Sequence, residues 1–189
     1  MRDPALTNSG LLLLRVLLGV LLAGHGGLKF LQPGGLDFEA ELLVKDGLRG
    51  GRLAAAVSGI TQVGAGALLA AGLLTPLAGA GAIGALVVAV LAKAQNGFWV
   101  AQDGAEFPLM FVVLGIVVTL VGPGQWSLDH VLHITPTTAE TVGAIALGLL
   151  SGLATFPALR RRRTDPGRAH IAAATLTSSP PLNREKDPA

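Results

Sequence analysis

The sequence lacks cysteine altogether and has few charged residues. With no cysteine among 189 residues, a disulfide framework, a thiol relay, an iron–sulfur cluster and a Cys-ligated zinc site are all excluded. Charged residues make up 14% of the chain, whereas hydrophobic residues make up 51% and the mean hydropathy is +0.60. An ordinary soluble domain has about 25% charged residues. The composition therefore predicts a membrane protein, whose first partner is the lipid bilayer.

The body of the chain also has no excess of positive charge. The formal net charge of +2 divides unevenly, because residues 1–159 carry 7 Lys+Arg against 9 Asp+Glu and residues 160–189 carry 7 against 3. The basic excess therefore belongs to the tail. A nucleic-acid partner is not expected for the body of the chain.

Long apolar segments are the main signal of the fold. Residues 53–92 contain no charge, and 40 helical residues would reach about 60 Å, twice the roughly 30 Å hydrocarbon core. This stretch must fold back, and residues 72–76 (GLLTP) offer the turn because a proline suits the first turn of the next helix. We predict five membrane-crossing helices, at about residues 11–28, 53–73, 76–93, 107–121 and 141–159.

The predicted fold class is all-α, a polytopic transmembrane helix bundle. A four-helix core covers residues 1–135, a fifth helix with a basic stop signal covers 136–163, and a disordered cytoplasmic tail covers 164–189. We interpret the first apolar segment as a helix rather than a cleaved signal peptide, because Arg15 interrupts it and no clear cleavage site follows. Residues 32–51 contain a short amphipathic piece, at 38–48, expected to lie at the membrane interface.

The distribution of Lys and Arg predicts the orientation. If the basic run at 160–163 is cytoplasmic, five spans place the N-terminus outside. The cytoplasmic side then holds nine basic residues, which are Lys29, Lys45, Arg49, Arg52, Lys93 and Arg160–Arg163, and the outside holds only Arg2. Small residues at four-residue spacing, as at Gly66–Ala70 and Ala80–Gly84, mark faces where helices are expected to pack closely.

Three polar residues on the first helix are candidate binding residues. At 100° per residue, Lys29 lies about 40° and His25 about 80° from the direction of Arg15, so the three can line one side of the helix. Arg15 either extends to the near interface or faces the bundle. His25 lies deeper, and either bonds to a neighbouring helix as a neutral histidine or handles protons or a headgroup.

Two further candidates are Gln62 and Glu106. Gln62 is expected to bond across helices. Glu106 opens the fourth helix, where it either caps the helix or pairs with Lys93 or Lys29. His130 and His133 are three residues apart and would share a face if their loop were helical. No metal or haem site is expected, because no set of partner ligands accompanies them and His25 is the only histidine within a span.

The order of these motifs resembles one known family. The runs LLLLRVLLGVLLAGHGGLKF, ITQVGAGALLAAGLLTPLA and KAQNGFWVAQDGAEFPLMFVVLGIVVTLVGPGQWSLDHVL together resemble the DoxX family of small bacterial membrane proteins, over about residues 10–132. The resemblance implies a four-helix core in the cytoplasmic membrane. It also places the family's recurrent positions on Arg15, His25, Lys29, Gln62, Gly72, Glu106, Gly122, Gly124, Ser127 and Asp129.

The resemblance implies a redox context, and this sequence departs from the family's pattern at two positions. Family members are associated with quinone- or thiol-linked modules, such as the small subunit of an archaeal thiosulfate:quinone oxidoreductase and a mycobacterial membrane oxidoreductase complex. Many members have Glu where this chain has Gln62, and an amide cannot relay a proton as a carboxylate can. A histidine often found near Lys93 is absent.

These observations leave two functional hypotheses open. In the first, the chain is an accessory or quinone-interacting subunit of a membrane oxidoreductase complex, with Arg15, His25, Lys29, Gln62 and Glu106 contacting a quinone or partner. In the second, it is a non-catalytic anchor, assembly factor or stress-related scaffold whose polar residues serve packing. In both it is not an enzyme on its own, has no covalently bound cofactor, and has a second copy of itself as one candidate partner. A transporter fits less well, since no inverted repeat is evident.

Overall fold

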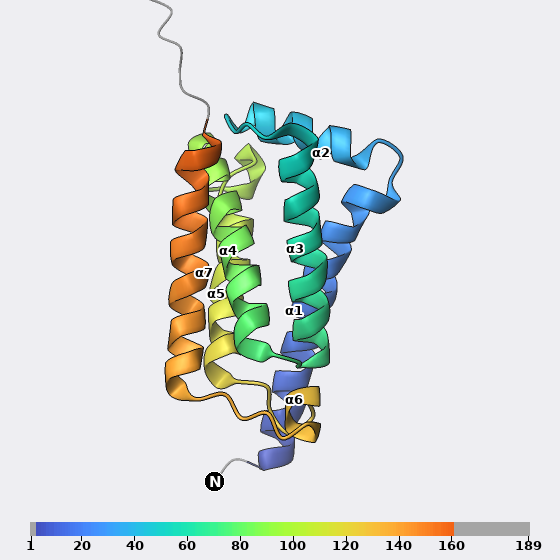
Figure 1. The fold of residues 1–189 in the computed structure, drawn as a ribbon, viewed down its shortest axis with the longest axis vertical. Helices are drawn as coiled ribbons and strands as arrows, with labels where there is room; N and C mark the ends of the chain where they lie inside the picture. Colours follow the sequence, from blue (N-terminus) through green and yellow to red (C-terminus); the bar gives the residue numbers. More distant parts are fainter. Residues whose placement is uncertain (1–2, 161–189) are drawn as a thin grey trace, which may run out of the picture.

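The computed structural model describes residues 3–160, and the predictions for Arg161–Arg163 and the tail lie outside them. The all-α prediction is confirmed (Figure 1). The α-helices are α1 (Pro4–Leu31), α2 (Gly35–Lys45), α3 (Gly51–Ala71), α4 (Thr75–Lys93), α5 (Glu106–Val121), α6 (Leu128–Val131) and α7 (Thr138–Leu159). Two short 3-10 helices, η1 (Ala94–Asn96) and η2 (Val100–Gln102), lie between α4 and α5.

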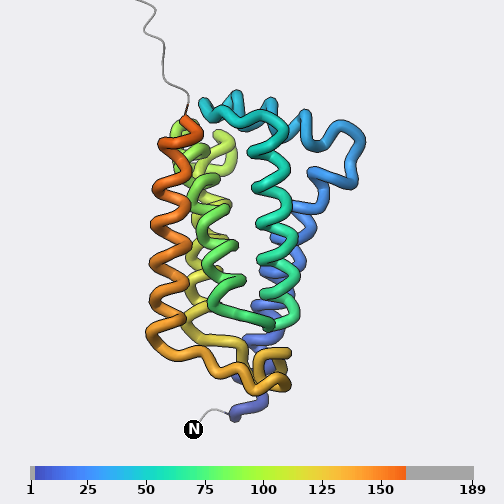
Figure 2. Tube along the Cα trace, viewed as in Figure 1, coloured from blue at the N-terminus to red at the C-terminus, as the bar shows by residue number. Residues whose placement is uncertain are grey.

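Within residues 3–160, the five longest helices, α1, α3, α4, α5 and α7, run between the two ends of the bundle (Figures 1 and 2). α1 lies along α3, and α4 lies along α5 and α7, while α3 and α4 join the two groups. The amphipathic piece forms α2, which crosses one end. We call this the α2 end, formed by residues 32–50, 94–105 and 160. α6 lies at the opposite end, and we call this the α6 end, formed by residues 72–74 and 122–137.

The helices begin and end at recognisable local signals. α1 begins at Pro4, earlier than expected, because the Asp3 carboxylate accepts a hydrogen bond from the backbone N–H of Ala5 and a proline fits the first turn. α7 begins with a capping box between Thr137 and Glu140. The predicted turn between α3 and α4 is confirmed, with Gly72 at φ 64° ending α3.

Small residues bring α1 and α3 into close contact. A Cβ on Gly26 would lie 2.7 Å from the carbonyl oxygen of Gly59, and a Cβ on Gly66 would lie 2.5 Å from that of Gly19. The Cβ of Ala23 lies in the same contact. The predicted packing face at Gly66 is therefore confirmed, since only a residue without a side chain allows the two backbones to approach this closely.

The contact between α4 and α7 is built in the same way. A Cβ on Gly152 would lie 2.8 Å from the carbonyl oxygen of Gly84, and one on Gly148 would lie 2.8 Å from that of Ala80. The predicted packing face at Ala80–Gly84 is therefore confirmed. Between the two helix groups lies an apolar core, which includes Leu18, Leu22, Leu69, Ala78, Ile83, Val112 and Val118.

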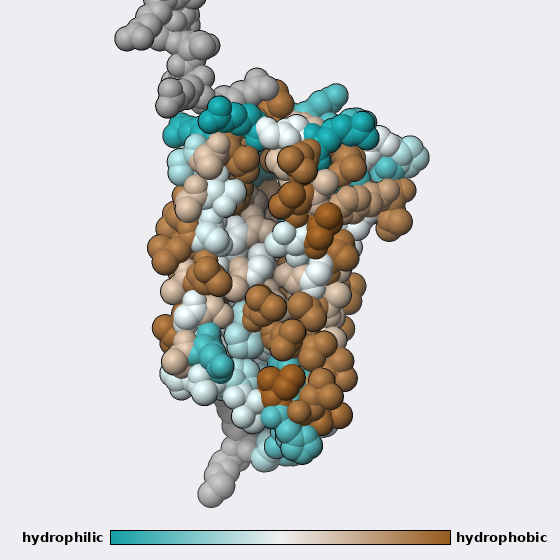
Figure 3. Space-filling model, viewed as in Figure 1, coloured by the Kyte–Doolittle hydropathy of each residue, from teal (hydrophilic) through white to brown (hydrophobic). Residues whose placement is uncertain are grey.

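The outside of the bundle is apolar along much of its length. Hydrophobic residues cover much of the face in Figure 3, whereas hydrophilic residues gather at the α2 end. In the described part of the chain, four helices, α1, α3, α4 and α7, are long and apolar enough to cross a bilayer. α5 has 16 residues, or about 24 Å of helix. Both tryptophans are exposed in the loops that flank α5, Trp99 at the α2 end and Trp126 at the α6 end, as at the two interfaces of a membrane protein.

Candidate functional site

Arg15 is buried at the α6 end of the bundle. Its side chain is only 3% exposed, and its Nη2 donates a hydrogen bond to the carbonyl oxygen of Trp126. A Cβ on Gly72 would overlap the guanidinium. Arg15 therefore faces the bundle, so of the two alternatives for this residue the extension to the interface is wrong. Gly72 is required twice, for its left-handed backbone and for the space that Arg15 fills.

Asp129 caps α4 from a distant part of the chain. Its carboxylate accepts hydrogen bonds from the backbone N–H of Leu74 at 2.7 Å and of Thr75 at 3.0 Å, and from the Thr75 hydroxyl at 2.8 Å. The backbone N–H of Asp129 donates to the Gly72 carbonyl oxygen at 2.9 Å. A fully buried carboxylate at a helix N-terminus is stabilised by these donors and by the helix dipole.

Arg15 and Asp129 belong to one polar cluster, which we call the Arg15 cluster and which also contains Gly72, Thr75 and Ser127. The Ser127 hydroxyl donates to the Gly124 carbonyl oxygen at 2.6 Å and accepts from the backbone N–H of His130 at 3.1 Å. Within residues 3–160, the Nε and Nη1 atoms of Arg15 have no hydrogen-bond partner. The cluster joins α1, the α3–α4 turn and the loop before α6.

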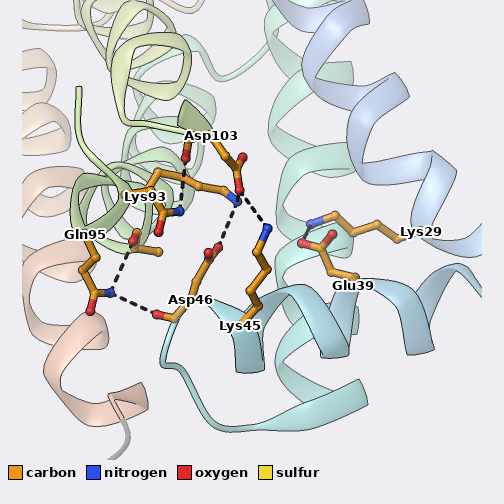
Figure 4. Close-up of polar contacts among 9 residues, drawn as sticks. Lys29, Glu39, Lys45, Asp46, Lys93, Gln95 and Asp103 are labelled. Atoms are coloured by element: carbon orange, nitrogen blue, oxygen red, sulfur yellow. Dashed lines mark hydrogen bonds and ion pairs between the residues drawn. The ribbon is translucent and has the colours of Figure 1, made fainter. Parts of the chain in front are cut away.

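A second polar cluster lies at the α2 end, around Lys29 (Figure 4). The Lys29 ammonium lies 2.7 Å from the Glu39 carboxylate on α2 and 3.1 Å from the Ser58 hydroxyl on α3. The side chains of Lys29 and Glu39 are 5% and 18% exposed. This pair therefore holds three helices together, with Lys29 more deeply buried than Glu39.

A third cluster at the same end surrounds Lys93 (Figure 4). The Lys93 ammonium lies 2.8 Å from the Asp103 carboxylate and 3.1 Å from that of Asp46, and Lys45 lies 3.6 Å from Asp103. Gln95 donates to the Asp46 carbonyl oxygen at 3.0 Å. The hydrogen bond from Lys93 and the nearby positive charges lower the pKa of Asp103 below its ordinary value.

His25 does not lie where the sequence predicted. Its side chain is exposed on the outside of α1, and within residues 3–160 it makes no hydrogen bond to a neighbouring helix. The reason is geometric. Gly19 and Gly26, which face α3, lie about 40° and 20° from Arg15 on one side, whereas His25 lies about 80° on the other side. Of the two alternatives for His25, the hydrogen bond to a neighbouring helix is therefore not formed within residues 3–160.

Gln62 and Glu106 also differ from their predicted contacts. Gln62 is buried, but in the described part of the chain its Oε1 atom has no hydrogen-bond partner, so the expected bond across helices is not formed. Glu106 stands in the first turn of α5 and accepts a hydrogen bond from the backbone N–H of Val100 at 2.9 Å. It does not pair with Lys93 or Lys29, because carboxylates of the loops and of α2 already neutralise both ammonium groups.

The five predicted residues therefore do not form one site. Arg15 and Lys29 are 14 residues apart on α1, which separates them by about 21 Å along the helix axis. Glu106 lies at the α2 end, and Gln62 lies within α3 against Gly26. The structure instead pairs the two lysines with residues that the sequence did not single out. Lys29 contacts Glu39 and Ser58, and Lys93 contacts Asp46 and Asp103.

Two cavities open at the α6 end. One, of about 290 Å³, is lined by the first turns of α4 and α7 and the last turn of α5, including Thr75, Thr119 and Thr138. The other, of about 420 Å³, is lined by residues of the loops and α6, including His130 and His133. α6 ends at Val131, and His133 has a φ of 59°, so the two histidines do not share a helical face. Within residues 3–160, no group of three or more metal-ligating side chains is found.

The comparisons with known proteins place part of this structure in a family. Residues 10–95, which cover most of α1, all of α2 to α4 and most of η1, match the family model described as DoxX. The protein carries a DoxX-family domain. Arg15, Lys29 and Gln62 lie within the DoxX domain, whereas Glu106 and Asp129 lie beyond it, so the wider resemblance over residues 96–132 stays a prediction. Searches of curated proteins and of solved structures each found no significant match.

The DoxX domain and the apolar helices agree on the class of protein. Four helices of the described chain are long and apolar enough to cross a bilayer, and three of them lie within or largely within the DoxX match. The chain is a membrane protein that carries a DoxX-family domain over residues 10–95.

Proposed function

We propose that this DoxX protein is a non-catalytic accessory subunit of a membrane oxidoreductase complex in the bacterial cytoplasmic membrane. The observation that carries the proposal is the separation of its polar residues into clusters at opposite ends of the bundle. A site for one small ligand needs polar groups that converge on a shared cavity. Arg15 and Lys29 are about 21 Å apart along α1 and each is engaged with neighbouring segments of the chain.

The contacts of these residues support a role in holding the bundle together. Lys29 joins three helices, and Asp129 caps α4 while lying next to Arg15. Burying a charge is costly unless it is paired or hydrogen-bonded, and Lys29 and Asp129 find their partners on other segments of the chain. The domain is therefore suited to act as a rigid membrane platform for a partner.

The sequence supports the need for a partner in redox chemistry. It contains no cysteine, and His25 is the only histidine within a predicted span. In the redox setting that the family suggests, a second subunit supplies the redox centre, and the DoxX protein holds that subunit at the membrane.

The positions of the basic residues support an orientation with the α2 end in the cytoplasm. Six basic residues of the described chain lie at or near this end, whereas the buried Arg15 is the only one near the α6 end. Positive residues accumulate on the cytoplasmic side of membrane proteins. α1 begins at the α6 end and α7 ends at the α2 end, so the N-terminus lies outside in this orientation (Figure 1).

A second candidate function is contact with a quinone at His25. The imidazole is exposed on the outer face of a membrane-crossing helix, within electrostatic range of Lys29 and Glu39. A quinone that diffuses in the bilayer could accept a hydrogen bond there without entering the bundle. A quinone photoprobe that labels the native chain but not His25→Ala supports this contact, and equal labelling of both removes it.

The main proposal is tested by purification of the tagged full chain from its native membranes in a mild detergent. We expect a complex with a second protein that carries a flavin, haem or iron–sulfur absorption spectrum and reduces or oxidises an added quinone analogue. Removal of the DoxX protein should release the partner from the membrane fraction. A preparation that contains only copies of the chain, or a purified chain that oxidises quinol by itself, contradicts the proposal.

A further inference from the structure

The basic residues of the described chain that lie at or near the α2 end divide into two groups. Four of them lie within 4.0 Å of a carboxylate, in the pairs Lys29–Glu39, Lys45–Asp103, Arg52–Asp37 and Lys93–Asp46. Arg49 and Arg160 are exposed and have no acidic partner within residues 3–160. Among these six basic residues, Arg49 and Arg160 are therefore the two that no carboxylate of residues 3–160 neutralises.

The backbone holds Arg49 and Arg160 next to each other, although 111 positions separate them in the sequence. The backbone N–H of Arg49 donates to the Leu159 carbonyl oxygen at 2.7 Å, and Leu48 stands opposite Arg160 in an antiparallel bridge. Leu48 is fully buried beside them and fixes the loop to the end of α7. The two residues are therefore placed by the fold rather than by chance contacts of long side chains.

The guanidinium groups remain available for a ligand. Both side chains are exposed, and the backbone bridge holds the two residues side by side at this end of the bundle. The Arg160 guanidinium lies over the Phe156 ring, 5.8 Å from its centre, and within residues 3–160 it makes no side-chain hydrogen bond.

The bridge lies at the depth of lipid headgroups. α7 has 22 residues, or about 33 Å, and ends at Leu159, directly before Arg160. The exposed side chains of α7 before this point include Leu147, Leu150 and Leu153, which face the hydrocarbon region. A phosphate at the membrane surface is therefore within reach of both arginines.

We propose that Arg49 and Arg160 form a binding site for an anionic phospholipid, which holds the loop between α2 and α3 and the end of α7 at the membrane surface. Each guanidinium donates paired N–H groups to phosphate oxygens, a geometry that a lysine ammonium does not reproduce. The paired cations Lys45 and Arg52 contribute little, because Asp103 and Asp37 already neutralise them. The site does not depend on the proposed role in an oxidoreductase complex.

The test compares two double variants that remove the same charge from the same end. Arg49→Gln/Arg160→Gln removes the unpaired arginines, and Lys45→Gln/Arg52→Gln removes two paired cations. Binding of dioleoylphosphatidylglycerol to the full chain in dodecyl maltoside is titrated by native mass spectrometry, with dioleoylphosphatidylcholine as the neutral lipid. An arginine near an anionic surface contributes about fivefold in affinity, so we expect the first variant to bind phosphatidylglycerol at least about tenfold more weakly.

The control variant should stay within about twofold of the native chain, and phosphatidylcholine binding should be equal in all three. Arg49→Lys/Arg160→Lys keeps the charge and the fold. Its affinity for phosphatidylglycerol should still fall by about threefold or more, because a lysine ammonium lacks the paired N–H donors of a guanidinium. Inorganic phosphate at the same concentration should not displace the lipid. Equal losses in both glutamine variants, no preference of the native chain for phosphatidylglycerol, or full binding by the lysine variant overturns the proposal.

Discussion

The ion pair between Lys29 and Glu39 provides the sharpest test of the role of the polar residues. Lys29 is the more deeply buried partner, with 5% of its side chain exposed against 18% for Glu39. Glu39→Gln leaves the Lys29 ammonium buried with only the Ser58 hydroxyl, 3.1 Å away. Lys29→Met instead leaves a carboxylate that water can reach. We therefore expect Glu39→Gln to destabilise the protein more than Lys29→Met does.

The expected losses in the free energy of unfolding follow from how deeply each side chain is buried. Removing one partner of a buried pair costs about 3–5 kcal/mol, and the partial exposure of Glu39 places Glu39→Gln at about 2–3 kcal/mol and Lys29→Met at about 1–2 kcal/mol. The double variant Lys29→Met/Glu39→Gln has no buried charge. We expect it to be more stable than Glu39→Gln alone. Adding Lys29→Met should therefore restore part of the unfolding free energy that Glu39→Gln removes.

The assay is the free energy of unfolding in mixed micelles, measured by circular dichroism as the fraction of denaturing detergent rises. A matched control is the pair Arg52–Asp37, whose atoms lie 3.1 Å apart but whose side chains are 69% and 55% exposed. This pair should couple by no more than about 1 kcal/mol. The reasoning is refuted if the effects of Lys29→Met and Glu39→Gln simply add, or if the exposed pair couples as strongly as the buried one.

Three further predictions concern packing, capping and pH. Gly66→Ala should destabilise the protein by about 1–3 kcal/mol because its Cβ would lie 2.5 Å from the Gly19 carbonyl oxygen, whereas Gly64→Ala, with nothing within 4 Å, should be neutral or slightly stabilising in the same unfolding assay. Asp129→Asn should cost about 2–3 kcal/mol because an amide replaces the carboxylate that accepts three hydrogen bonds at the start of α4; an unchanged unfolding free energy would contradict the capping role. The pKa of Asp103 is lower in the folded chain than its ordinary value of 3.8, so the ionised carboxylate stabilises the fold at pH values above 3.8. This stabilisation is lost as the pH falls through the lower, folded pKa. The melting temperatures of the native and Asp103→Asn chains should therefore differ at neutral pH and converge in acid.

Much of the fold could be predicted because its signals are local in the sequence. An uncharged stretch too long for one span, with glycine and proline near its midpoint, fixes the turn between α3 and α4. Small residues at regular spacing mark the faces of α3 and α4 that pack closely. The start of α1 lies before the predicted span, because Asp3 and Pro4 begin the helix ahead of the apolar run that marks the span.

The polar contacts could not be predicted because they depend on how distant segments meet. Lys29 pairs with Glu39 only because α2 folds back across the end of α1 and α3. His25 is exposed because Gly19 and Gly26 turn another side of α1 toward α3. The helical angle between His25 and Arg15 does not determine which side of α1 packs against α3. Asp129 caps a helix that begins 54 residues earlier, a relation that has no local signature.

The most direct test of the whole account is the side of the membrane on which each end of the bundle lies. Because the chain has no cysteine, Lys45→Cys and Gln125→Cys each introduce one label site, at the α2 end and the α6 end. With α3, α4 and α5 crossing between them, a membrane-impermeant maleimide should label Gln125→Cys in intact cells and Lys45→Cys only after the membrane is opened. Labelling of both positions from the same side would show that one of these three helices does not cross, and would contradict the account.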